Sequence, residues 1–334
     1  MLASTSLPLS SGDFSLDRRV DWARGLLSRG DTDTALDLLR QTIDDAPGFL
    51  AAWFLLGHTL ERTGVRDEAI GAYRRVVTLD PEDKLGASLR LARLENRKPD
   101  GMPPAYVRTL FDQNAARFET DLLKTLSYRG PELLRSAIER AARARKRPAR
   151  FARVLDLGCG TGLMGAAVRD LADELVGVDL SPAMIMRAQA KELYDRAAVG
   201  DLLAFLDDED GEFDLVLAAD VFVYLEDLRP VLSAARQRLA SGGLLAFTLE
   251  THRGNGVILH EALRFAHGRR HVRSAAKAAG FDVALLERAS TRTERGKPVD
   301  GLLVVLAPRG AQSRRNTRLA NRPVRSASSA VSRP

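Results

Sequence analysis

The sequence predicts an α/β domain built on an open, mainly parallel sheet and, in front of it, an all-helical module. Three observations lead to this prediction. Apolar runs of strand length alternate with helical patterns from residue 151 onward, as βαβ units require. Residues 153–162 read RVLDLGCGTG, a buried strand that runs into glycines spaced two apart. Before residue 98, the chain repeats itself with a period of 34 residues.

The repeat is visible as pairs of matching residues: Gly30, Ala35 and Pro47 recur as Gly64, Ala69 and Pro81. The second copy carries a set of small and aromatic residues, Trp53, Leu56, Gly57, Ala69, Tyr73 and Pro81. This set resembles a tetratricopeptide array of about two repeats, with a helix over 82–96 as its cap. We therefore expect a flexible N-terminus over 1–16 and a repeat module over 17–98. Such arrays bind peptides or partner proteins on a concave face or brace an oligomer, and both roles stay open.

A linker and further helices are expected over residues 99–150. Prolines and a glycine near residues 99–104 break the helical pattern. A helical stretch follows over 106–134, in which Phe111, Ala115, Phe118 and Leu122 share one face. We expect these helices to fold over the next domain as a lid.

The α/β domain is expected over residues 151–308. Its predicted strands cover 153–157, 174–178, 197–199, 213–219 and 243–250. Its predicted helices cover 162–171, 182–194, 201–207, 227–240 and 270–279, the second opened by a Ser-Pro cap. The segments at 281–287 and 301–308 fit an antiparallel hairpin at the edge of the sheet.

The glycine loop is the most informative site feature. Gly158, Gly160 and Gly162 let the backbone turn tightly and lie against a ligand without a Cβ in between. The loop follows Asp156 at the carboxyl edge of a strand, where open α/β sheets bind ligands. The GxGxxG pattern of dinucleotide sites is also present, ending at Gly165, but alone it is a weak signal. A carboxylate at Asp156 would repel a pyrophosphate and attract a cationic ligand.

Further acids end the following strands: Asp179, Asp201 in VGDL, and Asp220. With the glycine loop, these four motifs resemble those of class I S-adenosylmethionine-dependent methyltransferases. The FDxxAxxF run from Phe111 and the YRGPELL segment from Tyr128 are similar to bacterial members that also carry tetratricopeptide repeats.

The resemblance implies a Rossmann-like, seven-stranded sheet with an antiparallel last strand, an enzyme, and S-adenosyl-L-methionine as cofactor. In that family the first acid faces the donor's ammonium group, the second the ribose and the third the adenine. An arginine after the lid helices could bind the donor's carboxylate. The cofactor-binding residues implied are Asp156, Gly158, Gly160, Gly162, Asp179, Leu180, Met184, Asp201, Leu202, Asp220, Tyr128 and Arg129.

Catalytic residues are few in methyl transfer, because the protein mainly aligns donor and acceptor and accepts a proton. The candidates are Tyr224, Glu250, His252, His260, His267 and His271. We favour His252, just past the fifth strand, and His267, in a segment that the resembling family also carries. The histidines and the single cysteine have no zinc spacing, so we expect no metal. The chain also lacks the N/D-P-P-Y/F tetrapeptide of nucleic-acid amino-methyltransferases, reading ADVFVYL instead.

Composition limits the function further. Residues 309–334 hold seven arginines and no acid, which leaves 43 basic and 44 acidic residues elsewhere. The basic charge therefore belongs to a tail that we expect to be disordered, and specific nucleic-acid binding is not expected. No apolar run reaches membrane-spanning length, and the N-terminus lacks a signal-peptide pattern. With only Cys159 as a thiol, a cytoplasmic protein is expected.

The sequence leaves three functions to weigh. The first is methylation of an oxygen or nitrogen atom on a small-molecule acceptor. The second is protein methylation, with the protein substrate recruited by the repeats. The third is a non-catalytic repeat scaffold that senses S-adenosylmethionine.

Overall fold

The computed structural model describes residues 10–310, so the first nine residues and all of the predicted basic tail after Gly310 lie outside the described part. Five helices form the repeat module: α1 (Phe14–Ser28), α2 (Thr32–Asp45), α3 (Leu50–Thr63), α4 (Arg66–Leu79) and α5 (Ala87–Leu94). Asp13 and Asp31 cap the first two through hydrogen bonds from backbone N–H groups. A Cβ on Gly57 would lie 3.2 Å from the Tyr73 ring, which explains the small residue opposite the aromatic one. Two helix pairs, α1–α2 and α3–α4, followed by the covering helix α5, confirm the tetratricopeptide prediction.

The helical stretch predicted over 106–134 is divided into several pieces. It divides into α6 (Pro104–Asn114), the short α7 (Phe118–Thr120) and a π-helical turn over Asp121–Thr125, before α8 (Gly130–Ala144). The break follows Asn114, whose side-chain amide donates to the Leu110 carbonyl within the last turn of α6. Phe111 and Phe118 still meet across the break, with ring centroids 5.8 Å apart.

The central sheet has the predicted topology, with seven strands in the order β3-β2-β1-β4-β5-β11-β8. These strands are β1 (Phe151–Leu157), β2 (Ala172–Asp179), β3 (Arg196–Val199), β4 (Phe213–Ala218), β5 (Leu239–Glu250), β8 (Phe281–Ala289) and β11 (Gly301–Pro308). Only β11 runs antiparallel to both of its neighbours, β5 and β8. Two short strands, β6 (Val257–Leu259) and β7 (Phe265–His267), extend the sheet beside the end of β5, and β9 (Thr293–Glu294) pairs with β10 (Lys297–Pro298).

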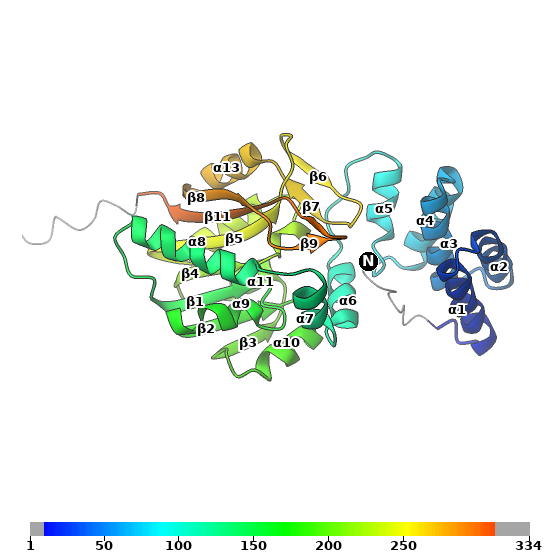
Figure 1. The fold of residues 1–334 in the computed structure, drawn as a ribbon, viewed down its shortest axis with the longest axis horizontal. Helices are drawn as coiled ribbons and strands as arrows, with labels where there is room; N and C mark the ends of the chain where they lie inside the picture. The colour runs from blue at the N-terminus through cyan, green and yellow to red at the C-terminus, as the bar shows by residue number, and fades with distance from the viewer. Residues whose placement is uncertain (1–9, 311–334) are drawn as a thin grey trace, which may run out of the picture.

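Helices cover both faces of the sheet (Figure 1). Between the strands run α9 (Leu163–Val168), α10 (Pro182–Gln189), α11 (Leu202–Asp208), α12 (Arg229–Arg238) and α13 (Arg269–Ala278). Residues of α8 and α9 pack on one face of the sheet, and residues of α11, α12 and α13 pack on the other. The helix predicted over 182–194 is shorter and ends at Gln189, which frees Tyr194 to turn inward.

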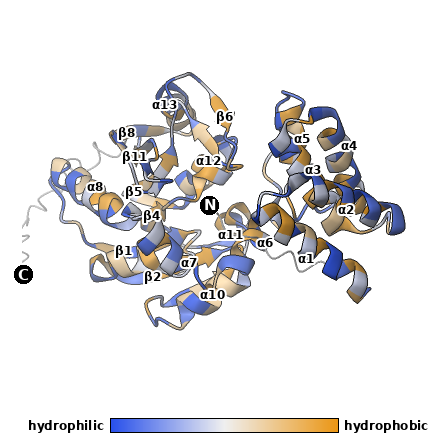
Figure 2. Ribbon diagram, turned by 45° about the vertical axis from the view of Figure 1, so that its right-hand side comes forward, coloured by the Kyte–Doolittle hydropathy of each residue, from blue (hydrophilic) through white to orange (hydrophobic). Residues whose placement is uncertain are grey.

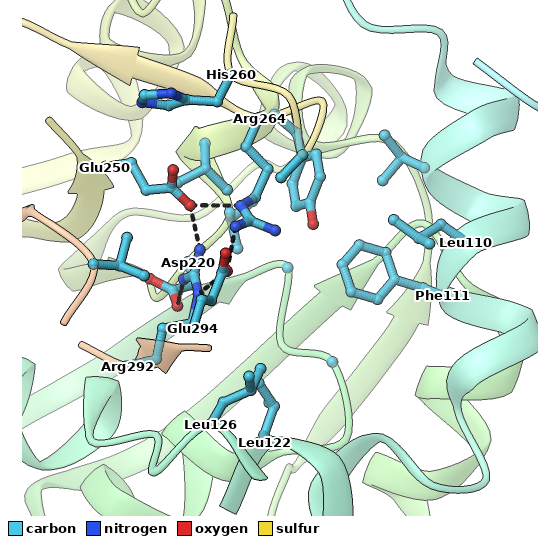
Figure 3. Close-up of a pocket in the computed structure, with 18 of the residues that line it drawn as sticks. Leu110, Phe111, Leu122, Leu126, Asp220, Glu250, His260, Arg264, Arg292 and Glu294 are labelled. Carbon is cyan, nitrogen blue, oxygen red and sulfur yellow. Dashed lines mark hydrogen bonds and ion pairs between the residues drawn. The ribbon is translucent and has the colours of Figure 1, made fainter. Parts of the chain in front are cut away.

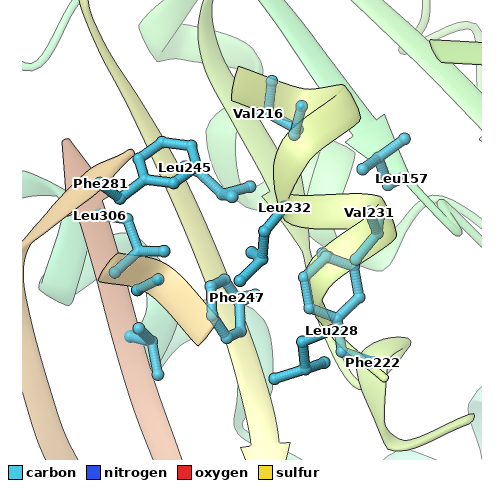
Figure 4. Close-up of a cluster of buried hydrophobic side chains, with 14 of the residues drawn as sticks. Leu157, Val216, Phe222, Leu228, Val231, Leu232, Leu245, Phe247, Phe281 and Leu306 are labelled. Carbon is cyan, nitrogen blue, oxygen red and sulfur yellow. The ribbon is translucent and has the colours of Figure 1, made fainter. Parts of the chain in front are cut away.

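The larger core cluster lies under α12 and α13 (Figure 4). Phe222 and Phe247 are fully buried there, with ring centroids 4.9 Å apart. Burying a side chain of that size contributes about 1.5–3 kcal/mol. Hydrophilic residues line the outer helix surfaces, while the strands are largely hydrophobic (Figure 2). This rigid sheet fixes the positions of the loops at its carboxyl edge.

The repeat module sits beyond α6, on the side where the strands' carboxyl ends and the lid helices meet (Figure 1). Lys98 Nζ bonds Glu226 at 2.7 Å across the junction. Tyr106 of α6 packs on Gly86, just before α5, where an added Cβ would lie 3.0 Å from the ring. Among residues 10–310, no helix combines the length and apolar character that crossing a membrane needs.

Candidate active site

The glycine loop joins β1 to α9 with three residues in the left-handed region: Gly158, Gly160 and Gly162, at φ +67°, +55° and +89°. A Cβ on Gly158 would lie 2.4 Å from a methyl group of Val221, so packing requires glycine there. A Cβ on Gly160 would meet nothing closer than Phe118, 3.8 Å away. Gly158 and Gly160 line a large cleft, whereas Gly162 packs on Tyr194 instead.

Asp179 holds this loop from the end of β2. Its Oδ2 accepts a hydrogen bond from the Gly160 N–H at 2.8 Å, and its Oδ1 accepts one from the Ser181 N–H at 2.9 Å. Burial raises the pKa of this carboxyl above its ordinary value, although the two N–H groups oppose the shift. Asp179 and Leu180 line the cleft together.

The other predicted donor residues divide into two groups. Asp201 caps α11 by accepting from the Leu203 and Ala204 N–H groups, and it lines the cleft with Leu202. Met184 is fully buried in the first turn of α10 and does not line the cleft.

Asp156 lies beneath the loop, is 1% exposed and does not line the cleft. Its Oδ2 accepts a 2.7 Å hydrogen bond from the Tyr194 hydroxyl, and within the described residues its Oδ1 has no partner. Burial, opposed by the Tyr194 bond and helped by nearby Asp179, raises the pKa of Asp156 to about 7. The sequence suggested that Asp156 contacts a ligand ammonium group directly. The structure instead places this carboxyl beneath the loop.

Tyr194 is a residue that sequence reasoning missed. Its ring lies where Cβ atoms on Gly165 and Gly177 would stand, 2.3 Å and 2.9 Å from its nearest atoms. These two glycines therefore make room for an aromatic support under the loop. No local motif marks it, because Tyr194 follows α10 by several residues and reaches the loop only through the fold.

The lid helices are fastened over the loop by polar contacts. Asp112 of α6 accepts hydrogen bonds from the Ser181 hydroxyl and, at 3.3 Å, from the Ala183 N–H. Glu119 pairs with Lys191. Phe111 also meets Tyr224, with centroids 5.6 Å apart. The lid thus forms one wall of the cleft.

A network of two arginines and three acids lies at the far side of the loop (Figure 3). Arg292, 6% exposed, bonds Asp220 at 2.6 Å, Glu294 at 3.1 Å and also Glu250. Arg264 bonds Glu250 at 2.5 Å and also Glu294. Burial of such charges is tolerated only when each one is paired and hydrogen-bonded. All five residues line the cleft.

Arg129, the predicted carboxylate partner, does not line the cleft. Its side chain is 59% exposed and pairs with Glu132 three residues later. A local partner on the same helical turn thus holds its guanidinium. Tyr128 does line the cleft, and burial raises the pKa of its hydroxyl well above the ordinary value.

Neither favoured histidine presents a free ring nitrogen to the cleft. His267 is fully buried outside the cleft lining, its Nε2 2.9 Å from the Leu225 carbonyl, and burial lowers its pKa to about 4. His252 lines the cleft, but its Nδ1 accepts from the Gly254 N–H at 3.1 Å and its Nε2 lies 3.2 Å from the Gly256 carbonyl. His252 therefore shapes its own loop. His260 also lines the cleft.

The cleft has a volume of about 1870 Å³ and runs from the glycine loop under the lid to the repeat module. Its inner wall is apolar and aromatic, with Val107, Leu110, Phe111, Phe118, Leu122, Leu126, Val223 and Tyr224. Within the described range, no group of three or more histidine, cysteine, aspartate or glutamate side chains could hold a metal ion.

Comparison with known proteins agrees with this architecture. A family model described as a methyltransferase domain matches residues 155–245, and one described as a tetratricopeptide repeat matches residues 20–84. Methyltransferase-like protein 27 of Homo sapiens is 34% identical over 175 residues, which cover 51% of this chain and 69% of the human protein.

Two further matches are more distant. Malonyl-[acyl-carrier protein] O-methyltransferase of Enterobacter lignolyticus is 34% identical over 108 residues, 32% of this chain and 43% of that protein. This chain thus spans less than half of that bacterial relative. The solved magnesium protoporphyrin IX methyltransferase of Synechocystis has a TM-score of 0.49 and 17% identity, covering 61% of this chain and 99% of that one. The chain belongs to the class I S-adenosylmethionine-dependent methyltransferases and carries tetratricopeptide repeats before its methyltransferase domain.

Proposed function

We propose that this protein transfers the methyl group of S-adenosylmethionine to an oxygen or nitrogen atom of a small molecule bound in the cleft. The observation that carries the proposal is the continuity of the cleft. It runs from the backbone of Gly158 and Gly160 into an apolar and aromatic part under the lid. Concave sites lined mainly by apolar and aromatic groups are typical of small-molecule sites. The single buried cysteine, Cys159, further supports a cytoplasmic setting for this activity.

We assign donor binding to the residues that line the cleft near the glycine loop: Gly158, Gly160, Asp179, Leu180, Asp201 and Leu202. The open space above Gly160 fits a ligand that lies on the backbone. When bound, the donor supplies a methyl group attached to a positively charged sulfur. Acidic groups around the loop favour a cation there. Asp156, Gly162 and Met184 support the loop from below in this proposal, and Asp220 contributes through its pairing with Arg292.

Acceptor alignment falls to the lid and to two tyrosines. Burial raises the pKa of Tyr128 well above its ordinary value and the pKa of Tyr224 to about 12, so both hydroxyls stay protonated at neutral pH. Tyr128 and Tyr224 line the cleft, and across residues 10–310 their hydroxyls make no hydrogen bond. They can therefore donate to a polar atom of the acceptor. Positioning of this kind supplies most of the catalysis in a displacement reaction.

The names of the relatives point to two kinds of acceptor. The curated matches include O-methyltransferases named for malonyl-[acyl-carrier protein] and for ubiquinone biosynthesis. The first name gives a malonyl group that is carried on a protein. Recruitment of such a carrier protein by the repeats is therefore the second candidate. The tetratricopeptide match supports that candidate.

Release of S-adenosylhomocysteine with a panel of small-molecule acceptors tests the proposal. The panel should contain phenols, carboxylic acids and amines, each assayed against protein alone and against Asp179→Ala. Turnover on a free acceptor that Asp179→Ala abolishes supports the proposal. Turnover only when a protein acceptor is added supports recruitment. Donor binding without turnover on either class would indicate a sensor.

A further inference from the structure

The cleft does not end at the methyltransferase domain. The same cleft that Gly160 and Asp179 line is also lined by a patch on the repeat module, which we name the repeat wall. The repeat wall consists of His58, Glu61 and Arg62 on α3 and Arg90 and Arg93 on α5. The repeats thus form one side of the proposed acceptor site.

The repeat wall carries excess positive charge. Glu61 is its one acid, and it is bonded by Arg90 at 3.2 Å, by Arg93 and by the Tyr73 hydroxyl at 2.7 Å. Arg62 is exposed and has no acidic partner in the described part of the chain. Burial and the nearby Arg90 lower the pKa of His58 to about 4, so this ring is neutral at physiological pH. Three arginines against one glutamate leave two unbalanced positive charges.

The opposite end of the cleft has the opposite character. Asp179 and Asp201 line it beside the glycine loop, where the cationic donor is proposed to bind. Between the two ends, Leu110 and Phe111 of α6 present an apolar surface to the cleft (Figure 3). A ligand that spans the cleft toward the repeats therefore meets apolar groups first and cationic groups last.

We propose that the repeat wall binds an anionic group of the methyl acceptor, so that the acceptor is an amphipathic anion whose apolar body lies along α6. This inference rests on the proposed function, since it concerns the same cleft. The shared chemistry is an oxyanion, a carboxylate or a phosphate, that guanidinium groups hold by charge-assisted hydrogen bonds. The repeats then determine acceptor specificity as part of the site itself.

Two fluorescent probes test the inference without knowledge of the acceptor. The first, 8-anilinonaphthalene-1-sulfonate, is an amphipathic anion, and the second, N-phenyl-1-naphthylamine, has the same rings without the sulfonate. Both are titrated into the full chain with S-adenosylhomocysteine present. Arg62→Glu should weaken the anionic probe about tenfold, because it reverses one charge of the wall, and leave the neutral probe unchanged. Phe111→Ala should weaken both probes, which locates them in the cleft.

The matched control is Arg29→Glu, the same charge change at the exposed end of α1 in the same module and outside the cleft lining. It should change neither probe. Displacement of the anionic probe by octanoate or by octyl phosphate then shows which oxyanion the repeat wall prefers. If octanol displaces this probe and neither anion does, the inference is contradicted. Equal effects of Arg62→Glu and Arg29→Glu would overturn it as well. Calorimetry of S-adenosylhomocysteine on the same samples separates this failure from failure of the proposed function, which would show as no donor binding.

Discussion

The Tyr194 hydroxyl donates a 2.7 Å hydrogen bond to Oδ2 of Asp156, directly beneath the glycine loop. The bond joins a residue after α10 to the penultimate residue of β1; the Asp156 side chain is buried and Tyr194 is half-buried. It supports the loop but gives only one of the two carboxylate oxygens a partner within residues 10–310. Burial, helped by nearby Asp179, raises the pKa of this carboxyl, although the Tyr194 bond opposes the shift.

Asp156→Asn should make the protein more stable at neutral and alkaline pH. The pKa of Asp156 is about 7 in the folded protein against an ordinary 3.8, so the folded state keeps a proton that the unfolded chain has lost. Stability from this group is present below about pH 4 and is lost as the pH rises to 7. Asparagine does not titrate, so the variant should not lose this stability, and its free energy of unfolding should be higher by up to about 4 kcal/mol. Melting curves from pH 5 to 8 should diverge as the pH rises, and parallel curves would contradict the assignment.

Gly158→Ala and Gly160→Ala should behave differently although the two glycines are two residues apart. The first places a Cβ 2.4 Å from the branched Val221 side chain, so the protein should lose stability by several kcal/mol. The second has open space and should cost only about 1 kcal/mol, from its positive φ. The methyl group that Gly160→Ala adds should weaken donor binding at least tenfold, because it occupies space in which the donor is proposed to lie. Thermal unfolding and calorimetry distinguish the two effects, and equal loss of stability would be the contrary outcome.

Asp179→Ala should weaken S-adenosylmethionine binding more than Asp156→Asn does. Asp179 lines the cleft and orders the loop through Gly160, whereas Asp156 lies below the loop. Loss of a charge-assisted hydrogen bond costs about 1.5–3 kcal/mol. NAD should neither bind nor raise the melting temperature. Micromolar NAD binding, measured by the same calorimetry, would restore the dinucleotide alternative.

His267→Gln should reduce the acid sensitivity of the protein and leave turnover nearly unchanged. Burial lowers the pKa of His267 from 6.5 to about 4, so its contribution to stability is present above pH 6.5 and is lost as the pH falls toward 4. The effect amounts to about 3 kcal/mol at most. Glutamine keeps a donor for the Leu225 carbonyl without the titration. A fall in kcat of a hundredfold or more in the folded variant would make His267 a catalytic residue after all.

Local features of the fold and of the candidate site could be predicted from the sequence. The glycine loop, Asp179 and the positions of the strands depend on short segments whose patterns have direct physical causes, namely positive φ, strand ends and helix caps. The repeat module could be predicted for the same reason, because Gly57 and Tyr73 meet within one repeat.

The charge network could not be predicted, because its members are far apart in the chain. Arg292 and Asp220 are separated by 72 positions, and Arg264 and Glu294 by 30. The sequence offered Arg129 as the arginine of the site, but Glu132, three residues later, pairs with it. The continuity of the cleft with the repeats likewise depends on how the two parts pack, which no motif records.

The most direct test of the account follows a labelled methyl group. The full chain is incubated with methyl-labelled S-adenosylmethionine and a cell extract that is afterwards separated into small molecules and proteins, with Asp179→Ala as the matched inactive control. The account predicts label on a small molecule with the wild type and none with the variant. Label confined to the protein fraction, or equal label with both enzymes, would contradict it.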